Sequence, residues 1–359
     1  MNKGIWKFLT ILGLLLAGIA FAMILVFRLQ VFGRVDFFTQ TTRLFIPQTE
    51  QSSVSQTQLL TQQDEISNIQ LDKQNLARLQ QGCFLGNDCI PSIDQPQFVS
   101  VRLASFMQSN DLVIGFVFQE NSQSAPVVKA YPVKILNWHE IVNDVAGNTP
   151  IAVTYCPLCM TPRVFDRILD GKAVTFGVSG MLLNSNLVMY DRETKSLWSQ
   201  FDGLALVGSK RDQKLQLYPS QLEKWSDWIK QYPQTQVLSE KTGYALPYNQ
   251  YPYDDYEKNS DIYFPLEHID NRFPPKEVVF GIVLGNQEKV YPESELQKAL
   301  PNGGSFSDQF AGKNLTVSYD KKTFNVTDAQ TREQILNTVS YYFTWAAFYP
   351  NTEIYQAQI

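Results

Sequence analysis

The chain is poor in the residues that carry most catalytic and metal chemistry, and it has no block of charge of one sign. Its 359 residues include 2 histidines and 4 cysteines, and the 30 lysines and arginines are outnumbered by 35 aspartates and glutamates. The formal net charge is −5. A nucleic-acid-binding protein normally carries a basic patch or stripe, which this sequence lacks. The composition therefore predicts no nucleic-acid partner.

Several motifs of well-known enzyme classes are also missing. The chain has neither a Walker pattern nor a dinucleotide-binding glycine pattern. Gly177-Val178-Ser179-Gly180 lacks the glycine spacing of a nucleophile elbow, so a serine hydrolase is unsupported. The Cys-x-x-Cys segment is not followed by His, which disfavours covalent c-type haem. Whether the protein is an enzyme is left open.

The N-terminal segment holds a long hydrophobic run. Phe8 to Phe27 carry no charge, and about 20 residues at a rise of about 1.5 Å match the roughly 30 Å hydrocarbon core of a bilayer. A cleaved signal peptide is the alternative, but its apolar region is shorter, at about 7 to 15 residues. The sequence predicts a single-pass membrane protein, anchored by Phe8 to Phe27, with its soluble domain outside the cytoplasm.

Composition divides the chain into three parts. Residues 1–34 form the predicted anchor with its flanks, and residues 35–82 form a polar stalk rich in Gln, Ser and Thr. Residues 83–359 contain short runs of branched and aromatic residues bounded by turn residues, which is typical of strands. This part is predicted to be the soluble, β-rich domain.

Two segments of this domain resemble each other. Residues 112–159 and 278–320 share a strand pair, a Tyr-Pro and an Ala-Gly turn before a strand that ends in Tyr. The fold class expected is α+β and β-rich, with probable internal duplication of a strand-turn-helix-strand unit, preceded by one N-terminal transmembrane helix. The first copy alone contains His139 and runs into Cys156 and Cys159. Any chemistry is therefore expected in the first copy.

The segment Cys156-Pro157-Leu158-Cys159 has three interpretations. A redox dithiol usually places its first thiolate at a helix N-terminus, whereas the residues after Pro162 favour a hairpin. A tight turn suits a metal site, because both sulfurs can face one ion. The third interpretation is a structural pair. The metal interpretation takes His139 as third ligand, on a helix predicted over residues 133–144, and allows one zinc or copper ion. A core histidine is the alternative for His139.

Other residues are candidates for a site or a crosslink. Cys83 and Cys89 bracket a short loop and are predicted to form a disulfide if the domain is exported. The catalytic candidates are His139, Glu140, Cys156 and Cys159. The candidates for a pocket wall are Trp138, Asn143, Asp144, Asp191, Arg192, Trp198 and Gln200.

Five sequence motifs, in this order along the chain, resemble those of one family. They are LNWHEIVND, TPIAVTYCPLC, VFDR, FGVSGMLLNSNLVMYDRETKSLWSQ and LYPSQ. They are similar to the uncharacterised prokaryotic family called domain of unknown function 3179, over roughly Ile90 to Ser318. The resemblance implies no reaction. Met160 stands where Gly commonly follows the second Cys in that family, which disfavours a metal knuckle.

The function expected from the sequence is a membrane-anchored, extracytoplasmic protein with a metal or redox centre at Cys156 and Cys159. One alternative is a non-catalytic binding or interaction module of the cell envelope, with structural cysteines. Another is a thiol-disulfide oxidoreductase. The small-molecule or protein partner is not identified by the sequence.

Overall fold

The computed structural model describes residues 73–321 and 323–358. One compact unit contains residues 61–251 and 255–359. A second unit contains residues 1–60 with 252–254, and its larger part lies outside the described residues. The predicted anchor at 1–34, with its span Phe8 to Phe27, and the stalk up to residue 72 lie outside them as well. The account below concerns the first unit.

The expected membrane localisation is corrected by the structure. Within 73–321 and 323–358, no helix is long and apolar enough to cross a membrane. The five α-helices described there have six or seven residues each, far fewer than the roughly 20 that a span requires. They are α3 (Lys73–Arg78), α4 (Val133–His139), α5 (Trp225–Gln231), α6 (Glu293–Ala299) and α7 (Tyr342–Phe348).

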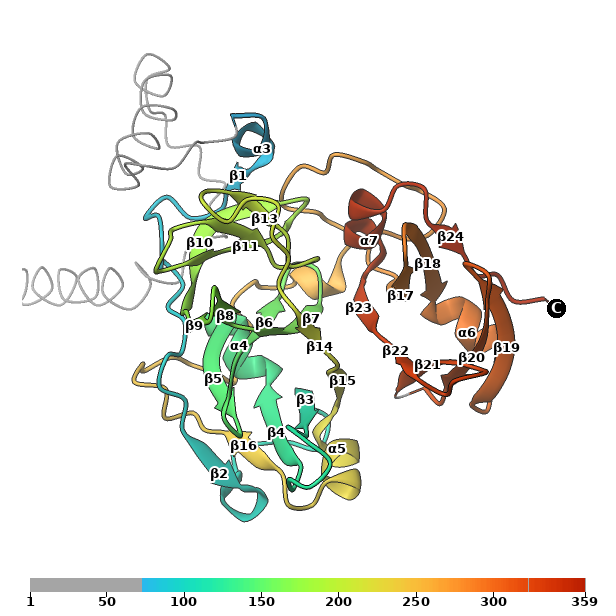
Figure 1. The fold of residues 1–359 in the computed structure, drawn as a ribbon, viewed down its shortest axis with the longest axis horizontal. Helices are drawn as coiled ribbons and strands as arrows, with labels where there is room; N and C mark the ends of the chain where they lie inside the picture. The colour runs from blue at the N-terminus through green and yellow to red at the C-terminus, as the bar shows by residue number, and fades with distance from the viewer. Residues whose placement is uncertain (1–72, 322, 359) are drawn as a thin grey trace, which may run out of the picture. The chain divides into compact units, whose positions relative to one another are not determined.

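The described chain is dominated by small sheets (Figure 1). Three sheets are built from residues 80–238. The first has the order β1 (Gln80–Gln81), β10 (Phe176–Leu183), β11 (Asn186–Asp191), β12 (Leu197–Ser199), β13 (Ala205–Val207). The second is β14 (Leu217–Tyr218), β7 (Thr161–Asp166), β6 (Thr149–Cys156), β5 (Ile141–Ala146). The third is β15 (Gln221–Lys224), β3 (Leu112–Phe118), β4 (Val127–Pro132), β16 (Gln236–Leu238), β2 (Phe98–Ser100).

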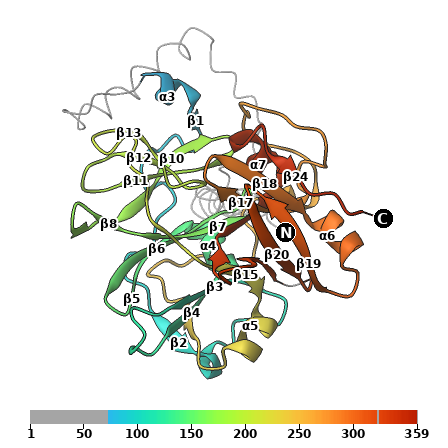
Figure 2. The ribbon, with the colours of Figure 1, turned by 45° about the vertical axis from the view of Figure 1, so that its right-hand side comes forward.

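Two further four-stranded sheets come from the C-terminal part, and Figures 1 and 2 show β17 beside β18 and β19 beside β20. The fourth sheet is β23 (Asn337–Tyr341), β17 (Val278–Leu284), β18 (Gln287–Pro292), β24 (Glu353–Ile354). The fifth is β19 (Gly304–Phe310), β20 (Lys313–Tyr319), β21 (Phe324–Asp328), β22 (Gln334–Ile335). A small hairpin, β8 (Ile168–Leu169) and β9 (Lys172–Ala173), and two 3-10 turns, η2 (Val101–Leu103) and η3 (Tyr256–Lys258), complete the described elements.

The expected α+β class with a strand-turn-helix-strand unit is wrong. Each expected unit is divided between two sheets: β3 and β4 lie in one sheet and β5 and β6 in another, and likewise β17 and β18 lie apart from β19 and β20. The outer strands of the β3 and β17 sheets come from distant sequence. β15 pairs with β3, and β16 pairs with β4 in parallel. The protein is therefore predominantly β, with short helices as links.

Local sequence signals nevertheless set several elements. Asp170 and Gly171 both have positive φ and form the tight turn between β8 and β9, as the Asp-Gly pair predicts. The helix predicted over 133–144 ends earlier, because Glu140 takes a φ of 58° and stops it. Ser220 and Glu223 have the spacing of a capping box, which predicts a helix that starts there, but Glu223 belongs to β15 and α5 begins only at Trp225.

The β3 and β17 sheets each bury a tryptophan against a glycine. Trp228 of α5 covers Gly115 of β3, and its indole N–H donates to Thr235 at 3.0 Å. Trp345 of α7 covers Gly281 of β17, and its indole donates to Thr352 at 3.0 Å. A glycine is required in each strand because the ring occupies the volume that a side chain would take.

We expect Gly115→Ala to destabilise the fold by about 1–3 kcal/mol, the usual cost of overpacking a core. The added Cβ would lie 2.2 Å from Cζ3 of Trp228, so the ring or the strand must shift. The measurement is the free energy of unfolding in urea. Val117→Thr, at an exposed position of the same strand, is the control and should change it by less than about 0.5 kcal/mol. An unfolding free energy for Gly115→Ala equal to that of the control would contradict the packing described.

Candidate functional site

Cys156 and Cys159 lie in a tight β-hairpin turn. Cys156 ends β6 and pairs with Thr161, the first residue of β7. The backbone N–H of Cys159 donates to the carbonyl of Cys156 at 3.3 Å and closes the turn. Met160 follows with a φ of 57°, a left-handed conformation that glycine adopts without steric cost. The hairpin expected in the residues after Pro162 is the separate one formed by β8 and β9, and both cysteines are free thiols.

Both thiols are buried, with exposed fractions of 1% for Cys156 and 0% for Cys159. The side-chain amide of Asn186, at the start of β11, donates to the sulfur of Cys159 at 3.0 Å. The sulfur of Cys156 lies 3.9 Å from the carbonyl of Ser185. The turn from β10 into β11 therefore provides the polar surroundings of both sulfurs.

The two thiols have opposite pKa shifts. Burial alone raises the pKa of a thiol, but hydrogen bonds from Cys156, Thr161 and Asn186 outweigh it, so the pKa of Cys159 lies below its ordinary value. The Thr344 hydroxyl lies close enough to act in the same direction. The pKa of Cys156 is raised by burial, by its hydrogen bond to Cys159 and by the negative charge there. Of the two thiols, Cys159 is therefore the one that ionises more readily, and Cys156 is the one that keeps its proton.

Gln200 fixes the arrangement of the strands around the thiols. Its side-chain N–H groups donate to the Thr154 hydroxyl at 3.0 Å and to the Thr161 carbonyl at 2.9 Å. Its carbonyl oxygen accepts from the Asn186 amide at 2.8 Å. One buried side chain therefore ties β6, β7 and β11 together and orients Asn186 toward Cys159.

A buried cation occupies the same hairpin. Arg163 pairs with Thr154 across β6 and β7, two residues from the pair of Cys156 with Thr161, so these four side chains share one face. The Arg163 Nε donates to the Phe201 carbonyl at 2.8 Å. Burial lowers the pKa of Arg163 to about 10, and negative charge at Cys159 acts against that shift. Arg163 remains positively charged at neutral pH.

Several buried oxygens around the thiols have no hydrogen-bond partner in the part of the chain that the structure describes. Leaving a buried polar atom unpaired costs about 1–3 kcal/mol, so such atoms mark places where a polar ligand is favoured. Beside the thiols these are Ser185 Oγ and Asn186 Oδ1, and Thr344 Oγ1 has no such partner other than the Cys159 sulfur.

Segments distant in sequence cover the turn. The Tyr256 hydroxyl donates to the carbonyl of Leu158 at 2.9 Å. The backbone N–H of Tyr341, in β23, donates to the carbonyl of Cys159 at 2.9 Å. Leu158 itself is buried. These contacts close the turn to large molecules.

His139 lies in a different hydrogen-bond network. Its Nδ1 is 2.7 Å from the carbonyl of Pro91, which can only accept, so Nδ1 carries the proton. Its Nε2 is 2.6 Å from the Tyr248 hydroxyl. Burial lowers the pKa of His139. The imidazole is thus a neutral core histidine with both nitrogens paired.

The donor set does not fit the zinc or copper ion expected from the sequence. Within residues 73–321 and 323–358, no group of three or more His, Cys, Asp or Glu side chains is placed to hold a metal ion. A structural zinc site needs four such ligands and a catalytic one three. The assignment of Cys156, Cys159 and His139 as ligands stays a prediction, and no chemistry is derived from it.

Most other candidate residues take part in structural networks. Trp138 donates from its indole to the Gln250 carbonyl at 3.0 Å. Glu140 ends α4. Asn143 exchanges hydrogen bonds with the backbone of Phe176, at 2.8 and 2.9 Å, and donates to Asp94. Asn143 therefore joins β5 to β10, away from the sulfurs.

Two more of the candidates pair with each other. The Trp198 indole donates to the Asp191 carboxylate at 2.9 Å, and Thr194 also binds that carboxylate. This contact fixes the turn between β11 and β12.

Among the candidates for a pocket wall, Gln200 is the residue that lies beside the thiols. Sequence reasoning missed Arg163, Asn186 and Thr344 as site residues, although Asn186 belongs to a conspicuous polar run.

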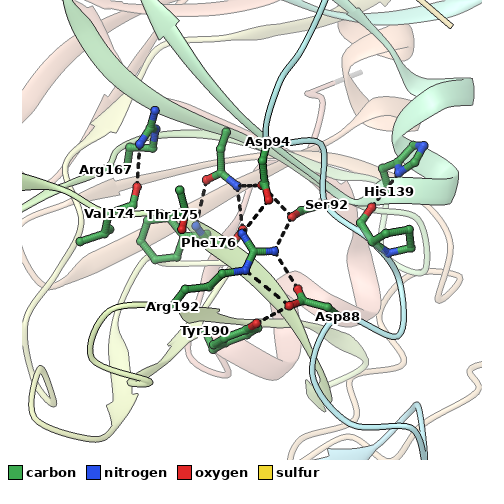
Figure 3. Close-up of polar contacts among 12 residues, drawn as sticks. Asp88, Ser92, Asp94, His139, Arg167, Val174, Thr175, Phe176, Tyr190 and Arg192 are labelled. Atoms are coloured by element: carbon green, nitrogen blue, oxygen red, sulfur yellow. Dashed lines mark hydrogen bonds and ion pairs between the residues drawn. The ribbon is translucent and has the colours of Figure 1, made fainter. Parts of the chain in front are cut away.

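Arg192 contacts the loop of residues 83–94, which lies between β1 and β2 (Figure 3). Its guanidinium contacts Asp88 at 2.9 Å and Asp94 at 3.0 Å, and the Tyr190 hydroxyl donates to Asp88 as well. Cys83 and Cys89 are joined in a disulfide within the same loop. The disulfide closes the loop 83–94 on itself, and the ion pairs of Arg192 with the hydrogen bond of Tyr190 hold it against the end of β11.

Comparison with known proteins identifies one family. The profile of the family described as "Protein of unknown function (DUF3179)" matches residues 87–335, from before β2 to the end of β22. No curated protein and no solved structure matches the chain. The matched region contains the thiol hairpin.

The candidate Asp144 is half of a buried ion pair with Lys129 at 2.7 Å, and it also accepts from the Tyr131 hydroxyl. We expect Asp144→Asn to lower the free energy of unfolding by about 3 kcal/mol, because the buried ammonium loses its carboxylate. The matched control is Asp308→Asn in the β19 strand. Lys289 there keeps a second carboxylate, Glu353, at 2.7 Å, so the loss should be smaller. Equal losses in urea unfolding would contradict this comparison.

The lowered pKa of His139 has a consequence for stability. Below about pH 6.5 the unfolded chain takes up a proton on this imidazole that the folded chain resists, so the free energy of unfolding falls as the pH falls through that range. We expect His139→Gln to reduce this slope between about pH 6.5 and pH 5. Above about pH 8, where the imidazole is neutral in both states, the two profiles should run parallel. Identical slopes at acid pH would argue against a buried neutral histidine.

Proposed function

The chain belongs to the DUF3179 family, and because that description names no activity, we propose from the thiol geometry that it is a dithiol–disulfide redox protein. Its redox centre is the Cys156 and Cys159 pair. Cys159 is the thiolate that attacks, and Cys156 is the thiol that completes the disulfide.

One observation carries the proposal. The Asn186 amide donates to the Cys159 sulfur at 3.0 Å inside a buried cage, and the pKa of Cys159 lies below its ordinary value while that of Cys156 lies above it. A redox dithiol needs this asymmetry, because the thiolate is the nucleophile and the second thiol must stay protonated until its turn. A purely structural pair of buried thiols has no need of it.

The absence of a long helix after the cysteines does not count against this function. In a helical dithiol site, backbone N–H groups at the helix N-terminus stabilise the thiolate. Here the Asn186 amide and the Thr161 hydroxyl lower the pKa of Cys159 in the same way. The hairpin provides the close spacing of the two sulfurs, and the side chains provide the donors.

The chemistry is a two-electron exchange. With a small disulfide such as oxidised dithiothreitol as the partner, the Cys159 thiolate attacks one of its sulfurs, the disulfide bond breaks and one sulfur leaves as a thiolate. The Cys156 thiol then gives up its proton and attacks the mixed disulfide at Cys159. A Cys156–Cys159 disulfide forms, and the partner leaves with both electrons as two thiols.

The test is a redox titration of the full chain in dithiothreitol buffers of graded oxidation, with the Cys156–Cys159 disulfide quantified by alkylation and peptide mass. We expect a two-electron transition that is separate from that of Cys83 and Cys89 and absent from Cys156→Ser and Cys159→Ser. Thiolate ultraviolet absorbance against pH should show Cys159 ionising below the ordinary cysteine pKa, and Asn186→Leu should raise that midpoint. Thiols that stay reduced at every ratio would sink the proposal.

A further inference from the structure

Resting on the proposed dithiol centre, we infer that its oxidant is hydrogen peroxide or a hydroperoxide of similar size, attacked by Cys159 beside the Asn186 amide and the Thr344 hydroxyl.

Burial sets the size of the oxidant. A disulfide on another protein must place its sulfur in line with the attacking thiolate, which requires an exposed thiol. Cys159 is fully buried and Leu158 lies buried within the same turn, held by Tyr256. Hydrogen peroxide is close to water in size and needs only a small opening. The geometry therefore favours a small oxidant over a protein disulfide.

The polar atoms at the site match the hydrogen-bonding needs of a peroxide. Hydrogen peroxide has two O–H donors and lone pairs on both oxygens. Asn186 Oδ1 is a buried acceptor without a partner among the described residues, and Thr344 Oγ1 is a buried hydroxyl whose one neighbour of this kind is the Cys159 sulfur. Asn186 contacts that sulfur through the nitrogen of the same amide group, so its oxygen also lies near the sulfur.

Charge at the site favours the reaction as well as binding. Negative charge develops on the leaving oxygen when the O–O bond breaks, and fixed donors or cations near that oxygen lower the barrier. Arg163 supplies a buried positive charge on the same face of the hairpin as Cys156. The hydroxyl of Thr344, beside the Cys159 sulfur, supplies a donor at the same place.

The step balances without a further co-reactant. The Cys159 thiolate attacks one peroxide oxygen, the O–O bond breaks, and Cys159 becomes a sulfenic acid while hydroxide leaves. The hydroxide takes the Cys156 proton and becomes water. The Cys156 thiolate attacks the Cys159 sulfur, the S–O bond breaks, and the leaving hydroxide takes a proton from solvent. The dithiol loses two electrons, and one peroxide becomes two waters.

The experiment uses the full chain, reduced with dithiothreitol and freed of the excess. We expect hydrogen peroxide to form the Cys156–Cys159 disulfide, one peroxide per disulfide, at a rate at least about tenfold above that of the bulky cumene hydroperoxide. Cys156→Ser should stop at a Cys159 sulfenic acid, read as the gain of one oxygen in the mass of the intact protein. Thr344→Val should slow the peroxide reaction about tenfold, whereas Thr344→Ser, which keeps the hydroxyl, should retain the rate.

The outcomes separate this inference from the function on which it rests. If the disulfide forms in dithiothreitol buffers but peroxide reacts no faster than with the unfolded, reduced chain, the peroxide inference is overturned and the dithiol function stands. If neither treatment forms the disulfide, both fall. Should Thr344→Val fail to fold, the mass of Cys156→Ser after peroxide treatment still decides the question, because a protein that gains no oxygen at Cys159 contradicts the proposed attack.

Discussion

The hydrogen bonds of one buried amide, Gln200, hold the candidate site together. Gln200 contacts Thr154 on β6, the Thr161 carbonyl on β7 and Asn186 on β11. Because a buried polar group is costly unless it is paired, these strands can pack only in an arrangement that satisfies all three contacts. That arrangement brings the Asn186 amide to the Cys159 sulfur.

Around this amide, two opposing effects decide the state of the thiols. Burial disfavours a thiolate, and hydrogen bonds to sulfur favour it. At Cys159 the donors outweigh burial, while at Cys156 burial and the neighbouring negative charge act in the same direction. The difference between two cysteines three residues apart thus comes from their surroundings. Neither the spacing nor the proline between them would reveal which sulfur carries the charge.

A buried charge or polar group needs a partner. This rule also explains the positions of several residues that the sequence predicts to be functional. His139, Asn143, Asp144 and Asp191 are all buried, and each has specific hydrogen-bond or ionic partners. Their conspicuous chemistry serves the packing of sheets and turns. The unpaired amide oxygen of Asn186 is the better indicator of a place for a ligand.

The sequence by itself determined the local features: the strands around residues 112–118 and 149–156, the hairpin with the Asp170-Gly171 turn, and the family. These depend on neighbours in the chain, such as alternating side chains and positive-φ residues. Tertiary structure alone decided the division into five sheets and the surroundings of the thiols. Asn186 and Thr344 reach Cys159 from β11 and α7, because pairing between strands distant in sequence brings those segments together. Such pairing depends on the packing of the whole domain, which no local pattern specifies.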